Sequence, residues 1–243
     1  MSPPALDEPA AAFDFGRFEA LSFDCYGTMI DWETGILAAL RPVLESHGAR
    51  VKEDDALLEA FGRHETAIES AGYLPYREVL AGVLRRLGDE LGFSPTDEEA
   101  SAFAASVGDW PPFDDSPAAL RALGERFGLA VITNCDDDLF ARSGERLGVE
   151  FDWVVTAERA RAYKPSHRNF ELAFETIGLP TQRILHVAQS LFHDHVPAKQ
   201  LGLATVWVDR RKGREGPGAT QPAAAEPDLR VPDMDTLAEL AAS

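Results

Sequence analysis

Five short apolar runs stand out along the chain, each bounded by polar or glycine residues. They cover residues 19–23, 129–133, 151–156, 183–188 and 204–209. Between the last four runs, apolar positions recur at helical spacing, and most of these stretches close on a glycine. Strands that alternate with helices predict an α/β fold, here a Rossmann-like doubly wound parallel sheet with right-handed crossovers.

The first connection departs from this alternation. About 105 residues separate the first two runs, far more than an ordinary crossover needs. Helical patterns fill this interval, so we expect an inserted helical cap domain over the carboxyl edge of the sheet. The predicted domains are a loose N-terminal tail (1–16), an α/β core (17–32 and 111–243) and the cap (33–110). A loop rich in Gly, Pro and Ala at 211–228 precedes a final helix.

Composition limits the partners and the compartment. The net charge of -18 and the pI near 4.6 argue against nucleic acid or an anionic membrane as a partner. No apolar run approaches the roughly 20 residues that cross a bilayer, and the N-terminus lacks a signal-peptide pattern. The only cysteines, Cys25 and Cys135, do not suggest a disulfide framework. We therefore expect a cytoplasmic enzyme whose site is locally positive if its substrate is an anion.

Polar side chains follow four of the predicted strands. Each alone has an ordinary explanation as a turn, cap or surface residue. Together they lie at the carboxyl ends of strands, where open α/β sheets bind their ligands. The residues are Asp24 after the first strand, Thr133 and Asn134 at the end of the second, Lys164 after the third, and Gln189, Ser190 and Asp194 after the fourth.

Four segments that carry these residues resemble the motifs of the haloacid dehalogenase superfamily, in order and with similar spacing. They read "SFDCYGTMID", "VITNCDDD", "YKPSHRNFELA" and "HVAQSLFHDHVPAKQLGLATVWVDR". The resemblance covers the whole predicted core, and a helical cap agrees with it. Within the superfamily, "DCYGT" is most like the L-2-haloacid dehalogenase branch.

The resemblance implies that Asp24 is a nucleophile. Superfamily phosphatases carry a second aspartate two residues later, because an alkoxide leaving group needs a general acid. This chain has Tyr26 there, and halide leaves without a proton. Phosphatases also hold Mg²⁺ with several carboxylates, whereas neutral Gln189 replaces one of them here. The expected site therefore needs no metal and no cofactor.

The implied reaction is the hydrolysis of a small anionic 2-haloacid through a covalent aspartyl ester. Lys164 would keep Asp24 ionised, and Asp194 would orient Lys164 or the hydrolytic water. The expected substrate-binding residues also include one arginine from the cap, which would receive the departing halide. The full set is Tyr26, Thr28, Arg63, Thr133, Asn134, Gln189 and Ser190, with Tyr76, Trp110 and Phe113 as candidate pocket walls.

Three departures from the branch keep alternatives open. Gln189 and Leu191 replace the usual Ser and Asn of the fourth motif, and Phe170 replaces a tyrosine. The alternatives are a phosphatase, a hydrolase that opens a strained ring in a 2-carboxylate, and a binding protein that has lost turnover. Capped members often form dimers, so a homodimer also stays open.

Overall fold

The protein forms one parallel sheet of six strands. The structure, a computed structural model, describes residues 13–51, 53–214, 216 and 218–243, so most of the predicted tail lies outside it. The strand order is β3-β2-β1-β4-β5-β6, and every described pairing is parallel. The strands are β1 Ala20–Phe23, β2 Gly128–Thr133, β3 Trp153–Thr156, β4 Ile184–Ala188, β5 Ala204–Val208 and β6 Leu229–Val231. The predicted fold class is confirmed.

The sixth strand is absent from the prediction. β6 has three residues, of which Leu229 and Val231 are buried and Arg230 is exposed. It pairs with β5 at the edge of the sheet, from Val206 opposite Leu229 to Val208 opposite Val231. Three residues are too few for a periodic pattern, so the strand exists because β5 offers it a partner.

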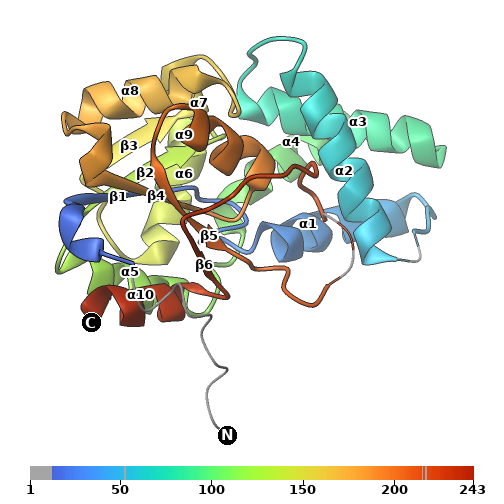
Figure 1. The fold of residues 1–243 in the computed structure, drawn as a ribbon. Helices are drawn as coiled ribbons and strands as arrows, with labels where there is room; N and C mark the ends of the chain where they lie inside the picture. The colour runs from blue at the N-terminus through green and yellow to red at the C-terminus, as the bar shows by residue number, and fades with distance from the viewer. Residues whose placement is uncertain (1–12, 52, 215, 217) are drawn as a thin grey trace, which may run out of the picture.

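Helices cover both faces of the sheet (Figure 1). One face packs against α5 Ser116–Gly124, α6 Asp137–Leu147 and α10 Met234–Ala242, and the other against α8 His167–Ile177 and α9 Val196–Gln200. β1 shows the division, because Leu21 and Phe23 belong to the first apolar cluster and Ala20 to the second. Burial on both faces explains why the strands read as continuous apolar runs.

The long connection after β1 is helical, as its pattern predicts. It contains α1 Trp32–Ser46, α2 Asp54–Glu69, α3 Tyr76–Leu91, α4 Asp97–Ala105 and a 3₁₀ turn at Ser106–Asp109. We refer to these elements together as the helical insertion. They gather beyond the carboxyl ends of β1 and β2, at the right of Figure 1. The exact limits of the core and cap domains stay predictions.

A core aspartate fixes the insertion to the sheet. Asp136, just after β2, accepts hydrogen bonds from the backbone N–H groups of Tyr76 (2.8 Å) and Arg77 (3.1 Å) at the start of α3. Its carboxylate thereby satisfies two donors that a helix start leaves unpaired, and it complements the helix dipole. This contact sets where α3 meets the carboxyl edge.

Among the described helices, none is long and apolar enough to cross a membrane. The cytoplasmic location stays a prediction.

Candidate active site

The strand order reverses at β1, and a cluster of charged side chains lies there. β2 and β4 flank β1 on opposite sides, so the segments that follow these strands meet at one point of the carboxyl edge. Asp24 follows β1 directly, and Asp194 lies in the short turn Leu191–His195 after β4. Lys164 arrives from the segment between α7 Ala157–Ala160 and α8. All three side chains are buried.

Lys164 bridges the two carboxylates. Its Nζ donates to Asp24 Oδ1 at 2.8 Å, to Asp194 Oδ1 at 2.7 Å and to the carbonyl oxygen of Ile132 at 2.8 Å. Three acceptors satisfy all three protons of an ammonium group. Only 2 % of this residue is exposed, yet the two carboxylates raise the pKa of the Lys164 ammonium above its usual value despite its burial. Lys164 is therefore a fixed cation.

The two aspartates differ in basicity. Burial raises the pKa of Asp24 above its usual value, against the opposing effect of Lys164. Asp194 is also buried, but Lys164 and a hydrogen bond from His186 hold the pKa of Asp194 well below its usual range. Asp24 is thus the more basic carboxylate of the pair, which favours it as a nucleophile, while Asp194 stays ionised and orients Lys164.

A histidine inside β4 supports Asp194. His186 Nε2 lies 3.0 Å from Asp194 Oδ1, and His186 Nδ1 lies 2.9 Å from the hydroxyl of Ser22 in β1. Because the ionised Asp194 only accepts, His186 Nε2 carries the proton and Nδ1 accepts from Ser22. The other oxygen of Asp194, Oδ2, is buried without a hydrogen-bond partner among the described residues. That oxygen is free to accept from a bound water.

Thr28 holds the second oxygen of Asp24. Its Oγ1 donates to Asp24 Oδ2 at 2.6 Å and accepts from the backbone N–H of Gln189 at 2.9 Å. Both oxygens of Asp24 thus have a donor, which fixes the plane of the carboxylate. Thr28 is predicted to bind the substrate, and in the structure its hydroxyl contacts Asp24.

Asn134 orients the backbone of Lys164. Its Oδ1 accepts from the Lys164 N–H at 2.7 Å, and its Nδ2 donates to the Lys164 carbonyl oxygen at 3.1 Å. Tyr26 points to the other side, where its hydroxyl lies 3.0 Å from Ser143 Oγ and 3.4 Å from Cys135 Sγ. The Tyr26 hydroxyl is therefore engaged within the protein.

A small cavity of about 30 Å³ opens onto this cluster. Six predicted site residues line it: Asp24, Tyr26, Asn134, Lys164, Ser190 and Asp194. The other lining residues are His193 and Thr220 from the core, and Trp32, Glu65, Glu69 and Tyr76 from the helical insertion. We call this space the Asp24 cavity. It holds about one or two water-sized groups, which limits an occupant to a few heavy atoms.

Four predicted site residues do not line the Asp24 cavity, and Thr28 is one of them although it contacts Asp24. Arg63 lies on the outer side of α2, where its exposed guanidinium pairs with Glu90 at 2.7 Å, so its position does not support a substrate-binding role. Thr133 is buried, and its hydroxyl has no partner among the described residues. The backbone N–H of Gln189 donates to Thr28. Gln189 lines a separate, neighbouring cavity together with Trp32 and Arg210.

Sequence reasoning overlooked His186, Glu65 and Glu69. His186 is the only ionisable residue within the apolar run "ILHVA", and a polar residue at a buried strand position indicates a partner across the sheet. Glu65 lies one turn after buried Phe61 and three residues before buried Ile68, on the inner side of α2. This spacing from two apolar residues is the signal in the sequence that places Glu65 on the inner side of the helix.

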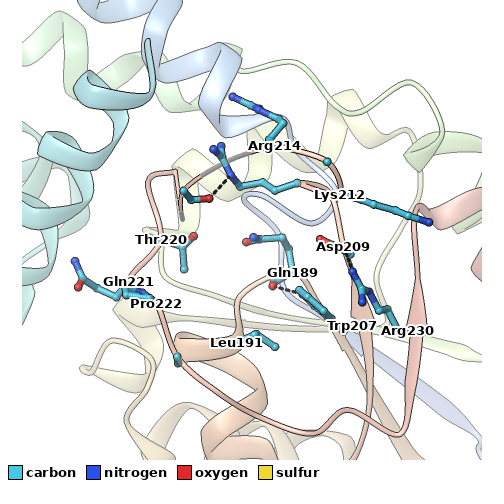
Figure 2. Close-up of a pocket in the computed structure, with 14 residues that line it drawn as sticks. Gln189, Leu191, Trp207, Asp209, Lys212, Arg214, Thr220, Gln221, Pro222 and Arg230 are labelled. Atoms are coloured by element: carbon cyan, nitrogen blue, oxygen red, sulfur yellow. Dashed lines mark hydrogen bonds and ion pairs between the residues drawn. The ribbon is translucent and has the colours of Figure 1, made fainter. Parts of the chain in front are cut away.

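A larger cavity of about 460 Å³ lies beside this site, beyond Gln189. Figure 2 shows its cationic wall, which includes Lys212, Arg214 and Arg230 from the segments around β5 and β6. Much of this positive charge is already paired, since Arg230 meets Asp209 and Arg214 meets Glu33 and Asp55. Thr220 lines both cavities.

Within the described part of the chain, no group of three or more His, Cys, Asp or Glu side chains is arranged to hold a metal ion. The ammonium of Lys164 lies between Asp24 and Asp194. The side chain of Lys164 is therefore the counter-ion of both carboxylates.

Comparison with known proteins agrees with this geometry. A family model described as haloacid dehalogenase-like hydrolase matches residues 18–194. Haloacetate dehalogenase H-2 from Moraxella sp. (strain B) is 27% identical over 93% of this chain and 99% of its own length. An (S)-2-haloacid dehalogenase from Pseudomonas sp. (strain YL) is 27% identical over 79% of this chain and 83% of its own. The structure of L-2-haloacid dehalogenase from Xanthobacter autotrophicus superposes with a TM-score of 0.78 at 20% identity, covering 93% of this chain and 99% of that one.

Proposed function

Because the chain belongs to the haloacid dehalogenase-like hydrolases, we propose that it hydrolyses short 2-haloalkanoic acids to 2-hydroxyacids. The reaction runs through an ester of Asp24 and needs no metal ion. The observation that carries the proposal is the bridge from Lys164 to Asp24 and Asp194, at 2.8 and 2.7 Å. This bridge gives the buried carboxylate of Asp24 a fixed counter-charge. Asp24 is also more basic than Asp194.

The first step is a displacement at carbon. Asp24 attacks the α-carbon, the carbon–halogen bond breaks, and halide leaves from the opposite side. Lys164 and Thr28 hold the two oxygens of Asp24, so the nucleophile is oriented before the substrate arrives. A halide leaves without the general acid that an alkoxide leaving group needs. The Tyr26 hydroxyl is hydrogen-bonded to Ser143, which agrees with a reaction that uses no general acid at this position.

The second step is hydrolysis of the ester. Water attacks the carbonyl carbon of Asp24, and the bond between that carbon and the ester oxygen breaks. The 2-hydroxyacid leaves with this oxygen as its hydroxyl and with inverted configuration. The partnerless Oδ2 of Asp194 is the acceptor that supports this water, because it is buried and belongs to a residue that lines the Asp24 cavity. His186 keeps Asp194 ionised and in place for this purpose.

The size of the Asp24 cavity supports short substrates. A cavity of about 30 Å³ holds one or two water-sized groups, so we expect the helical insertion to move away from the core to admit even an acid of two or three carbons, and longer acids to be excluded. The names of the relatives agree with this range, since one is a haloacetate dehalogenase and another an (S)-2-haloacid dehalogenase.

Halide release measured by ion chromatography tests the proposal. The protein is incubated in EDTA with fluoro-, chloro- and bromoacetate and with both enantiomers of 2-chloropropionate. We expect release that Asp24→Asn and Lys164→Ala reduce by about 1,000-fold or more, as for the loss of a nucleophile or its essential partner. Asp138→Asn, which changes an exposed aspartate, is the matched control and should keep full activity.

Two outcomes would contradict the proposal. Halide release that requires Mg²⁺ would contradict a metal-independent reaction and would favour the phosphatase alternative. No release from any substrate would leave the ring-opening and binding alternatives.

A further inference from the structure

Two glutamates of α2 face the reacting groups. Glu65 and Glu69 are four residues apart, so they share one side of the helix, and both line the Asp24 cavity. Glu65 is 5% exposed. The cap wall of this cavity thus carries acids where the sequence led us to expect an arginine.

Glu65 is held by a single donor. The hydroxyl of Tyr76 in α3 donates to Glu65 Oε1 at 2.7 Å. Tyr76 is itself fixed, because Asp136 binds its backbone N–H. Glu65 Oε2 has no hydrogen-bond partner among the described residues. It is not one of the fully buried atoms that lack a partner, so part of its surface is open. If Glu65 carries a proton, that proton belongs on Oε2, since Oε1 already accepts from Tyr76.

The surroundings of Glu65 favour its neutral form. Burial raises the pKa of Glu65 to about 7, against the hydrogen bond from Tyr76, which lowers it. Burial and the charge of Glu65 also raise the pKa of Glu69 well above its usual range. Among the described residues that line the cavity, Lys164 is the one cation, and it is committed to three other acceptors. The ionisable groups that line the cavity around Glu65 are Asp24, Tyr26, Glu69, Tyr76, Lys164, His193 and Asp194.

A departing halide needs a donor on this wall. Back-side attack places the leaving group away from Asp24, and the wall away from the core comes from the helical insertion. Its lining residues are Trp32, Glu65, Glu69 and Tyr76. The Tyr76 hydroxyl already donates to Glu65. Glu65 is buried and Glu69 only partly so, which makes the carboxyl group of Glu65 the more buried acid on this wall.

We propose that Glu65, as a neutral carboxylic acid, donates from Oε2 to the departing halide and is a further catalytic residue. The proposal rests on the dehalogenase function. While the bond from Asp24 to carbon forms and the carbon–halogen bond breaks, the halide gains a hydrogen bond from Glu65 and leaves as the anion. Hydrolysis of the ester then releases one proton to solvent, and Glu65 keeps its own.

The leaving group decides how much this donor contributes. Fluoride is the most basic halide and the strongest hydrogen-bond acceptor, so it gains most from a neutral acid and bromide gains least. The site is therefore suited to 2-fluoro acids as a substrate class. Ionised Glu65 would repel both the substrate carboxylate and the halide, so the rate should fall as the pH rises through about 7.

The test compares Glu65→Gln with Glu65→Ala on fluoro-, chloro- and bromoacetate between pH 5 and 9. Glutamine keeps an acceptor for Tyr76 and a neutral donor towards the cavity. We expect Glu65→Gln to stay within about fivefold of the wild type and to lose the fall in rate above pH 7. Glu65→Ala should lose about 100-fold on fluoroacetate and clearly less on bromoacetate, a size typical of the loss of one preorganised hydrogen-bond donor. Glu59→Ala, on the exposed side of the same helix, is the control.

A second variant moves the pKa without removing the acid. Tyr76→Phe deletes the hydrogen bond that lowers the pKa of Glu65, so the fall in rate should shift to higher pH. A structural role alone would not produce this shift.

The outcomes separate this proposal from the function on which it rests. Halide release that depends on Asp24 but is equal in Glu65→Ala and Glu65→Gln, or an unchanged pH profile in Glu65→Gln, would overturn the role of Glu65 alone. A wild-type protein that releases no halide from any of the three substrates would overturn both.

Discussion

At the scale of single residues, the site depends on buried charges that neutralise one another. Lys164, Asp24 and Asp194 are each at least nine-tenths buried. Removing one partner of such a group typically costs about 3–5 kcal/mol, because the remaining charge stays buried and unpaired. This dependence explains why the residues that do the chemistry also stabilise the carboxyl edge.

Glu65 gives a stability prediction with a definite sign. Its pKa is about 7 in the folded protein against an ordinary 4.5. The folded state therefore binds the proton more tightly, and this stabilising contribution is complete below pH 4.5 and lost as the pH rises to about 7. Glu65→Gln should match the wild type at pH 4 and exceed its free energy of unfolding by about 3 kcal/mol at pH 8. Urea unfolding at both pH values measures this difference.

Glu59→Gln, on the exposed side of α2, is the matched control. A gain in Glu65→Gln that is equal at pH 4 and pH 8 would show that Glu65 is not a buried titrating acid.

Single residues also show what the sequence could predict. Asp24, Lys164 and Asp194 follow strands, so their positions in the chain already bring them to one edge. The prediction of Arg63 depends on helical register alone, and an error of two residues turns a side chain from the inner to the outer side of a helix. Glu65 and His186 depend on contacts with distant segments, at Tyr76 and at Ser22 and Asp194, which no local pattern contains.

At the scale of elements, α2 is positioned by close contact with the segment before β6. A Cβ atom added at Gly62 would lie 2.1 Å from the carbonyl oxygen of Ala219, a backbone atom that cannot turn aside. The absence of a side chain at Gly62 lets α2 approach the segment that carries Thr220. This approach closes the Asp24 cavity, because Glu65 and Thr220 both line it.

Two helix glycines provide a matched pair for testing this contact. Gly62→Ala should lower the free energy of unfolding by about 1–3 kcal/mol through overpacking and should reduce kcat/KM by moving Glu65. Gly144→Ala, in α6, meets only Phe140 Cε1 at 4.0 Å, so the better helix propensity should stabilise the protein by up to about 1 kcal/mol. Thermal unfolding and halide release measure both effects. Equal effects of the two substitutions would contradict the close contact of α2.

At the scale of the whole molecule, a strongly acidic protein must admit an acidic substrate. The net charge is -18, and the cationic wall shown in Figure 2 is largely paired with carboxylates. Long-range repulsion should therefore slow the encounter with a 2-haloacid, while the chemistry in the buried cavity is shielded from salt.

Salt should consequently increase kcat/KM and leave kcat unchanged. Raising the ionic strength with sodium sulfate to about 0.15 M shortens the Debye length to about 8 Å, and we expect kcat/KM for bromoacetate to rise severalfold. Sulfate avoids adding a halide, which is a product. A fall in kcat/KM with salt would instead mean that the cationic wall attracts the substrate.

The arrangement of the whole fold was easier to predict than its details. Apolar runs and glycine-terminated helices specify the parallel sheet, and the long interval after Asp24 specifies the insertion. The three-residue strand β6 and the acid-lined wall formed by Glu65 and Glu69 arise only when segments far apart in sequence pack together. Local pattern carries little information on such contacts.

The central claim is that Asp24 forms an ester whose carbonyl carbon is attacked by water. A single turnover in H₂¹⁸O, with enzyme in excess over 2-haloacid, tests it most directly. We predict that mass spectrometry finds ¹⁸O in the peptide that contains Asp24, while the 2-hydroxyacid carries an unlabelled oxygen taken from that carboxylate. Label in the hydroxyl of the product, with an unlabelled Asp24 peptide, would mean that water displaces the halide directly and would contradict the account.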